Sequence, residues 1–202
     1  PYEEHEMQEL FPLTYEYLLP YKKELIEKKI RYKTNPKYWY ALHRSRDIQM
    51  FEQPKIITAE ISYGCNMTYD TTYMYHATTC YTILLNERNN EKSLAFLGLF
   101  NSRLLWYFLS ETGNVLRGGY FRFKTKYLEP FPIPEIPDDV ADLLSKKVQT
   151  VLDAKSVDIT AETKTIENEI NLLVYHLYGL TYDEALVVDP ETSITRQEYE
   201  RD

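Results

Sequence analysis

Apolar residues recur at helical spacing in four parts of the chain, and this spacing predicts most of the secondary structure. A period of three to four residues covers the segments 14–30, 92–110, 140–152 and 166–177. Pro20 should kink the first helix or mark its start, because proline removes an N–H from the helical ladder. Gly113 and Gly179 are placed to end the second and the last of these helices. Thr181 and Glu184 fit a capping box that opens one more short helix.

Other segments have the β-branched or alternating pattern of strands. Strands are expected at 55–61, 67–73 and 80–85, separated by polar turns. Residues 117–124 alternate basic and aromatic side chains around a glycine pair, which predicts a strand or hairpin with one apolar and one basic face. The sequence therefore predicts an α+β fold with a small mixed or antiparallel sheet core, flanking helices and a C-terminal helical part.

Charge is distributed unevenly along the chain. The total of −8 argues against a nucleic-acid partner, yet residues 31–126 carry +6, between −3 for residues 1–30 and −11 for residues 127–202. A basic middle between acidic ends suits a surface that contacts phosphates, although a solvated face explains many charge runs. We expect three parts: an N-terminal linking helix at 1–30, an α+β DNA-recognition core at 31–134, and a C-terminal helical subdomain and tail at 135–202.

Composition limits the class of protein. Cys65 and Cys80 have neither the spacing nor the histidine neighbours of a metal site, and their spacing leaves a disulfide open. No apolar run is long enough for a membrane span, and the acidic start of the chain is unlike a signal peptide. A cytoplasmic protein without a membrane partner is expected. The 19 tyrosines fit either half-buried interface positions or a tyrosine-tolerant core.

Signatures of catalysis are missing from the sequence. It contains no glycine-rich nucleotide-binding signature, no HExxH helix and no GxSxG turn. His43 and His76 have no neighbouring acid or nucleophile, and His176 falls in a predicted helix, where a packed or a surface histidine is expected. Asp138 and Asp139 are expected to begin a helix, where acidic side chains interact favourably with the helix dipole. We therefore expect no catalytic residues and no metal ligands in this chain.

The segment 117–126 has the strongest pattern for contact with DNA. Its candidate residues are Arg117, Gly118, Gly119, Arg122, Lys124 and Lys126. The glycine pair can adopt positive φ and allows the backbone to approach another molecule closely. The last three cations recur at strand period, so they are expected on one face, where they can bind phosphates or a guanine edge. A solvated hairpin edge with protective lysines is the alternative.

A second candidate patch lies before the first strand. The remaining candidate residues are His43, Arg44, Arg46, Lys55 and Arg103. The first three follow the aromatic segment 38–42, in which Trp39 is expected in the core rather than on a stacking surface. The last two are expected to complete the perimeter of the DNA-binding surface.

The order of several segments resembles a known family. These segments are 38–44, 51–57, 69–70, 97–104, 117–120, 127–134 and 170–181. They resemble the Taq-type carboxy-terminal specificity domain, which follows an adenine-specific DNA methyltransferase domain, often in single-chain type IIG restriction enzymes. The resemblance covers roughly residues 12–188.

The resemblance implies a non-catalytic domain that recognises a sequence in double-stranded DNA and helps to present a flipped adenine to the methyltransferase domain of the same polypeptide. No cofactor is expected in this chain, because the Asn-Pro-Pro-Tyr methyltransferase motif and a PD-(D/E)xK nuclease pattern are absent. S-adenosylmethionine, and magnesium for any nuclease part, are expected in other domains, so the chain looks like a fragment of a type II restriction–modification enzyme. The alternative is a structural docking or oligomerisation module without direct DNA contact.

Overall fold

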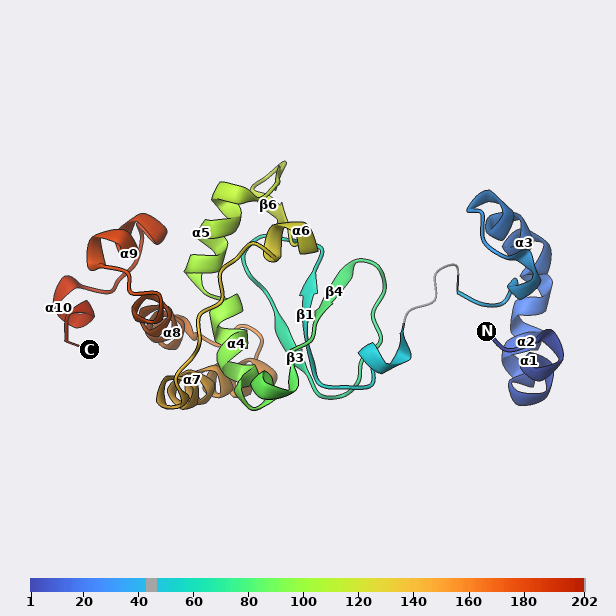
Figure 1. The fold of residues 1–202 in the computed structure, drawn as a ribbon, viewed down its shortest axis with the longest axis horizontal. Helices are drawn as coiled ribbons and strands as arrows, with labels where there is room; N and C mark the ends of the chain where they lie inside the picture. The colour runs from blue at the N-terminus through green and yellow to red at the C-terminus, as the bar shows by residue number, and fades with distance from the viewer. Residues whose placement is uncertain (43–46, 202) are drawn as a thin grey trace. The chain divides into compact units, whose positions relative to one another are not determined.

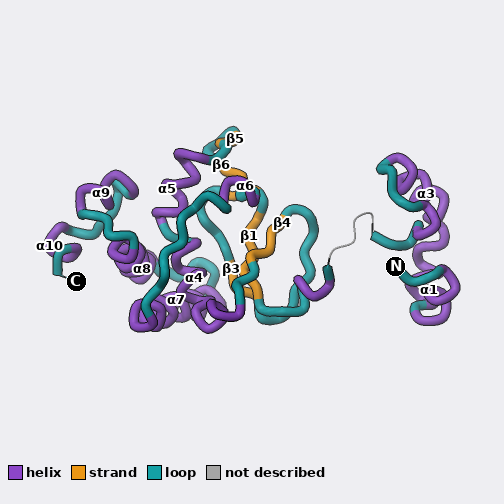
Figure 2. The backbone as a smooth tube through the Cα atoms, in the orientation of Figure 1, coloured by secondary structure: helices purple, strands orange, loops and turns teal. Residues whose placement is uncertain are grey.

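The computed structural model describes residues 1–42 and 47–201, and the chain forms two compact units, Pro1–Ile48 and Gln49–Asp202. The helices are α1 (Glu4–Leu10), α2 (Pro12–Leu18), η1 (Leu19–Tyr21), α3 (Lys22–Arg31), η2 (Pro36–Tyr38), η3 (Ile48–Met50), η4 (Glu87–Lys92), α4 (Ser93–Phe100), α5 (Arg103–Thr112), α6 (Thr125–Leu128), α7 (Asp138–Val157), α8 (Lys164–Leu177), α9 (Tyr182–Val188) and α10 (Arg196–Tyr199). The strands are β1 (Lys55–Ala59), β2 (Ile61–Ser62), β3 (Thr68–Asp70), β4 (Cys80–Ile83), β5 (Val115–Leu116) and β6 (Tyr120–Arg122). Figures 1 and 2 show these elements along the chain.

The first unit is built from short helices. The helix expected at 14–30 is interrupted, because Pro20 lies in the 3-10 turn η1 between α2 and α3. The effect expected of proline is therefore confirmed, and it divides the segment into two helices. Helix α1 was not predicted, although Glu3 and Glu6 form a capping box at its start.

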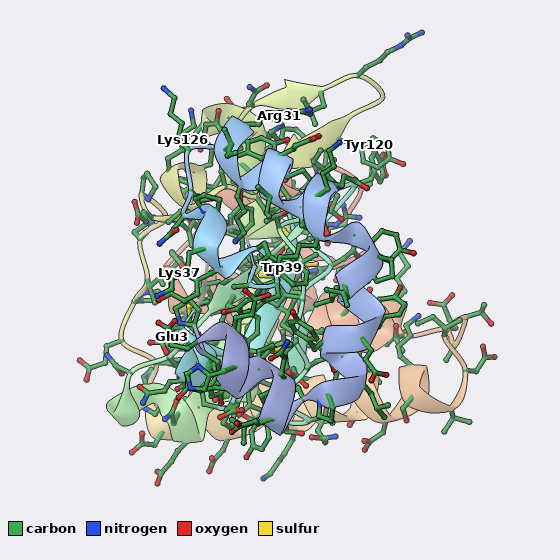
Figure 3. The ribbon with its side chains drawn as sticks, turned by 90° about the vertical axis from the view of Figure 1, so that its right-hand side faces the viewer. Glu3, Arg31, Lys37, Trp39, Tyr120 and Lys126 are labelled. Carbon is green, nitrogen blue, oxygen red and sulfur yellow. The ribbon has the colours of Figure 1, made fainter. Side chains whose placement is uncertain are left out.

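A network of partly exposed carboxylates joins these helices. Trp39 is buried against Tyr15, with ring centroids 5.7 Å apart, as expected of a core residue. One carboxylate oxygen of Glu4 accepts hydrogen bonds from the Tyr15 hydroxyl (2.8 Å), Lys22 (2.6 Å) and the Trp39 indole (3.1 Å). Glu3 binds Lys37 in the same unit (Figure 3). Three ion pairs, Glu3–Lys37, Glu4–Lys22 and Glu24–Lys28, thus form within this unit.

The second unit contains two small antiparallel sheets. Their strand orders are β3-β1-β4 and β2-β6-β5. The strand expected at 55–61 supplies β1 to one sheet and β2 to the other, because its ladder changes partners at Glu60. The N–H of Glu60 donates a hydrogen bond to the carbonyl of Thr79, and the carbonyl of Glu60 accepts one from the N–H of Phe123. The α+β class is confirmed, and all strand pairs among the described residues are antiparallel.

The helix expected at 92–110 is two helices, α4 and α5. Asn101 ends the first, and its side-chain amide binds both the N–H (2.8 Å) and the carbonyl (3.0 Å) of Met67. Ser102 then caps α5 by accepting a hydrogen bond from the N–H of Leu105. The apolar period continues across this break, and both helices contribute buried residues to the same core.

Helices α4, α7 and α8 form the main core beside the first sheet (Figure 1). Gly98 is at their closest contact, since a Cβ there would lie 2.9 Å from a Val148 methyl. Asp138 begins α7 as expected and pairs with Lys92 at 2.6 Å, an interaction that lowers the pKa of the Asp138 carboxyl. Farther on, the Thr181–Glu184 capping box is confirmed. None of the helices in the described part of the chain has the length and apolar character that crossing a membrane requires.

Candidate nucleic-acid interface

The hairpin β5–β6 is built around a glycine pair. Gly118 and Gly119 have φ of +84° and +79°, which L side chains rarely adopt, and the N–H of Gly119 closes the turn on Leu116. A Cβ on Gly119 would also lie 3.2 Å from the ring of Tyr63. The positive φ predicted for this pair is confirmed, and the close neighbour inside the chain is an aromatic ring.

The expected single basic strand is wrong. Strand β6 ends at Arg122, and Phe123 is fully buried. Lys124 then precedes the single helical turn α6, with its carbonyl accepting from the next turn, and Lys126 lies within α6. The three cations therefore belong to a strand end, a helix cap and a helix, so strand alternation does not place them on one face. The burial of Phe123 fixes the strand end in the core and turns the chain into the helix.

The cations of this segment have no acidic partners. We call Arg117, Arg122, Lys124 and Lys126 the hairpin cations. Arg117 and Lys126 are exposed, while Arg122 and Lys124 are half-buried. None of the four forms an ion pair with a described residue, and the Nε of Arg122 is buried without a hydrogen-bond acceptor. Lys126 lies 4.5 Å from the ring centroid of Tyr127, and its hydrogen bond lowers the pKa of that phenol.

A row of aromatic rings borders the hairpin. Tyr63 meets Tyr120 edge to face, with ring centroids 5.9 Å apart, and meets Trp106 at 6.0 Å. Tyr63 and Tyr120 are exposed, whereas Trp106 packs on the buried Phe121 at 4.5 Å. Tyr120 therefore does not join the core-facing residues of β6. Figure 3 labels Tyr120, one of these aromatic residues, and Lys126, one of the hairpin cations. Exposed aromatic rings can contact bases and sugars, and cations without acidic partners can contact phosphates.

Lys55 is not part of any such surface. Its side chain is fully buried, 2.5 Å from the carboxylate of Asp70 and 2.8 Å from the carbonyl of Phe51. The prediction that it lines the DNA-binding perimeter is therefore wrong. The partner lies on the neighbouring strand β3, opposite Lys55 in the antiparallel ladder. Only this register, which the sequence does not display, turns an apparently exposed lysine into a structural one.

Arg103 has different neighbours from the hairpin cations. It is the first residue of α5, exposed, with its Nε 4.0 Å from a carboxylate oxygen of Asp189. It lines a cavity of about 490 Å³ together with Cys65, Lys155 and Glu167. Burial raises the pKa of the Cys65 thiol to about 12, which disfavours the thiolate, the nucleophilic form of cysteine. The cavity was not anticipated from the sequence, because its walls come from segments about 100 residues apart.

His43, Arg44 and Arg46 lie outside the described residues, so the second candidate patch stays a prediction. Cys65 and Cys80 are free thiols. Within the described ranges 1–42 and 47–201, no three His, Cys, Asp or Glu side chains gather as a metal site would require. His176 packs within the fold, because its ring meets the ring of Tyr199 edge to face, with centroids 4.5 Å apart.

Comparison with known proteins gives this arrangement a family. The chain is 27% identical over 158 residues to "Type II restriction enzyme and methyltransferase RM.Eco57I" of Escherichia coli. The aligned part is 74% of this chain, and the chain spans only 16% of that relative's length. Residues 14–133, which include the hairpin cations and the aromatic row, match the family described as the TaqI-like C-terminal specificity domain. The chain therefore belongs to the family of TaqI-like C-terminal specificity domains of restriction–modification enzymes.

Proposed function

We propose that this chain binds double-stranded DNA directly and recognises a specific sequence for a restriction–modification enzyme. The observation that carries the proposal is the set of four hairpin cations without acidic partners, in a chain whose net charge is −8. Unpaired cations repel one another, and an acidic protein has ample carboxylates to neutralise them. DNA phosphates would supply the missing negative charge.

The two parts of the interface have different tasks in this proposal. The hairpin cations bind the phosphate backbone and fix the orientation of the domain, because phosphate contacts carry no sequence information. Tyr63 and Tyr120 present ring edges and hydroxyls that can meet base edges or sugars beside those phosphates.

Catalysis is assigned to other parts of the polypeptide. The relative's name combines restriction and methyltransferase activities, and this chain spans a small part of that relative's length. S-adenosylmethionine, any magnesium ion and the methylated adenine would therefore be bound by a methyltransferase part, and by a nuclease part if one exists. The specificity domain would contribute the choice of site.

The test is selection of DNA by the full gene product. The protein is incubated with a pool of random 30-base-pair duplexes, and bound duplexes are amplified and sequenced. The proposal expects one enriched sequence, bound on the order of tenfold more weakly by an Arg122→Ala/Lys124→Ala variant. A Lys146→Ala/Lys164→Ala variant is the control, because it removes two exposed lysines of α7 and α8.

If no sequence is enriched, the chain does not read DNA. The docking or oligomerisation alternative would then be favoured by a stable complex between the acidic C-terminal helices and another part of the gene product. If the control variant lost as much affinity as the hairpin variant, the interface would be misplaced.

A further inference from the structure

The loop between β3 and β4 exposes three large apolar side chains in succession. Tyr73, Met74 and Tyr75 are 49%, 61% and 60% exposed. They lie within residues 71–86, which contain no Asp, Glu, Lys or Arg. Burial in the core does not account for such a run, and loop tips normally carry polar residues.

A buried carboxylate holds the loop in one conformation. Asp70 accepts hydrogen bonds from the N–H (2.9 Å) and hydroxyl (2.8 Å) of Thr72 and from the N–H of Met74 (2.8 Å), besides its contact with Lys55. Burial by itself would raise the pKa of Asp70, but the bonds from Lys55 and Thr72 outweigh it and lower the pKa. The carboxylate stays charged and fixes the backbone from Thr72 to Met74.

The backbone of the loop is strained at its tip. Tyr73 has φ of +61°, the left-handed region that a bulky residue rarely occupies. Such strain costs on the order of 1–3 kcal/mol and persists only where surrounding contacts impose it, which is a recurrent property of functional loops. The ring of Tyr73 is only about half buried, at 49% exposed, so burial offsets only part of this cost.

The far side of the loop is fixed by stacking. The ring of Tyr75 lies parallel to Phe51, with centroids 4.8 Å apart, and its hydroxyl donates to Glu52 at 2.8 Å. His76 meets Phe51 edge to face and lies 2.6 Å from the Thr82 hydroxyl through its Nε2. Met74 is therefore presented between two fixed neighbours on a loop that has little conformational entropy left to lose on binding.

We propose that Tyr73 and Met74 form an apolar wedge that enters duplex DNA at one base step of the recognition site and partly unstacks it. The proposal rests on the function proposed above. Apolar wedges of this kind unstack a step and bend the duplex toward further protein contact. The loop has no formal charge to repel phosphates, and its threonine hydroxyls can donate to them.

A protein partner fits the loop less well. A stable protein interface buries about 800 Å² on each side, which three side chains on one loop do not supply. A base step, by contrast, accepts one or two apolar side chains. The observations therefore favour nucleic acid over a docking protein.

The test is a mismatch scan with the full gene product. A duplex enriched from the random pool is prepared in versions that carry one mismatched pair at each successive position, and affinity is measured by fluorescence anisotropy. Because a mismatch has already lost part of the stacking that the wedge must break, wild-type protein should bind one or two of these versions about tenfold or more tightly than the paired duplex.

The variant Met74→Ser should lose this preference, and Tyr73→Gly should weaken it while keeping the loop conformation, since glycine adopts positive φ freely. Val157→Ser is the matched control, because Val157 is an exposed apolar residue at the end of α7. It should keep the preference intact.

The outcomes separate the wedge from the proposed function. The wedge is overturned if sequence-selective binding exists but no mismatch tightens it, or if Met74→Ser keeps the tightening. Failure of the proposed function appears differently, as the absence of any enriched duplex for wild-type protein. Arg122→Ala/Lys124→Ala should bind every version more weakly and still prefer the same mismatches.

Discussion

The hairpin and the C-terminal helices of the second unit differ in how many of their cations have acidic partners. Two cations of the helices form ion pairs with described residues, whereas Lys146 and Lys164 of the same helices, like the hairpin cations, form none. In α7–α10, Lys147 pairs with Glu169 at 2.5 Å, Arg196 pairs with Asp183, and Lys155 donates to the carbonyl of Ala161. The hairpin cations pair with no described acidic residue. The two regions differ in net charge as well: residues 31–126, which include the hairpin, carry +6, whereas residues 127–202 carry −11.

This contrast indicates that the hairpin has positive charge available to bind an anionic ligand. Ion pairs on a surface contribute little stability, so their absence from the hairpin costs the fold little. Cations without acidic partners do, however, attract a polyanion that approaches to within the Debye length, about 10 Å at 0.1 M salt. The acidic helices would in turn disfavour DNA on their own side and so restrict binding to the hairpin surface.

The largest expected effect concerns Lys55, the cation that belongs to neither region. Asp70→Asn should lower the free energy of unfolding by about 3–5 kcal/mol, because it leaves a buried ammonium without a counter-charge. Chemical denaturation measures this loss. Lys55→Met/Asp70→Asn is the control and should recover much of it, since both charges are then gone. A loss below about 1 kcal/mol in the single variant would contradict a buried, charged Lys55–Asp70 pair.

The same pair predicts how stability depends on pH. The folded-state pKa of Asp70 is lowered, so its contribution is fully present above the unfolded pKa of about 3.9 and is lost as pH falls toward the folded value. Urea unfolding between pH 6 and pH 2 should show a steeper loss of stability for wild-type protein than for Lys55→Met/Asp70→Asn. Parallel curves would show that Asp70 titrates normally in the folded protein.

Two glycines with positive φ, one in each region, allow the same substitution to be compared between the regions. Gly119 in the hairpin and Gly179 after α8 both have positive φ, +79° and +65°. Replacing either by Ala should lower the free energy of unfolding by about 1–2 kcal/mol, because a side chain disfavours that backbone conformation. Only Gly119→Ala should also weaken DNA binding, since its Cβ would press on Tyr63. Equal DNA affinity in the two variants would show that Tyr63 is not part of the interface.

The smallest expected effect lies wholly within the helical region. The hydroxyl of Tyr175 is buried without a hydrogen-bond partner, and burial raises the pKa of this phenol. Tyr175→Phe should raise the free energy of unfolding by about 1 kcal/mol, because it removes an unsatisfied polar group, and should leave DNA affinity unchanged. Thermal unfolding and anisotropy measure the two quantities. A clear loss of stability would show that this hydroxyl has a partner in solution.

The sequence predicted elements better than it predicted the roles of single cations. Periodicity located the helices, since burial of one face requires it, but it could not show the break at Asn101, whose side chain binds the backbone of Met67, 34 positions away and just before β3. Alternation placed Lys124 and Lys126 in a strand, whereas the buried Phe123 ends that strand in the core. Lys55 was misassigned because its partner is set by strand register. The loop at Tyr73 was missed because its exposure depends on Asp70 hydrogen bonds that no spacing reveals.

The contrast between the two regions is tested most directly by the salt dependence of DNA binding. The observed binding constant of the full gene product is measured against salt concentration for wild type, Arg122→Ala/Lys124→Ala and Lys146→Ala/Lys164→Ala. Each lost phosphate contact should reduce the log–log slope by about 0.9, so the hairpin variant should lose about 1.8 from the slope and the helical variant none. An unchanged slope in the hairpin variant, or an equal reduction in both, would contradict the assignment of DNA binding to the hairpin cations.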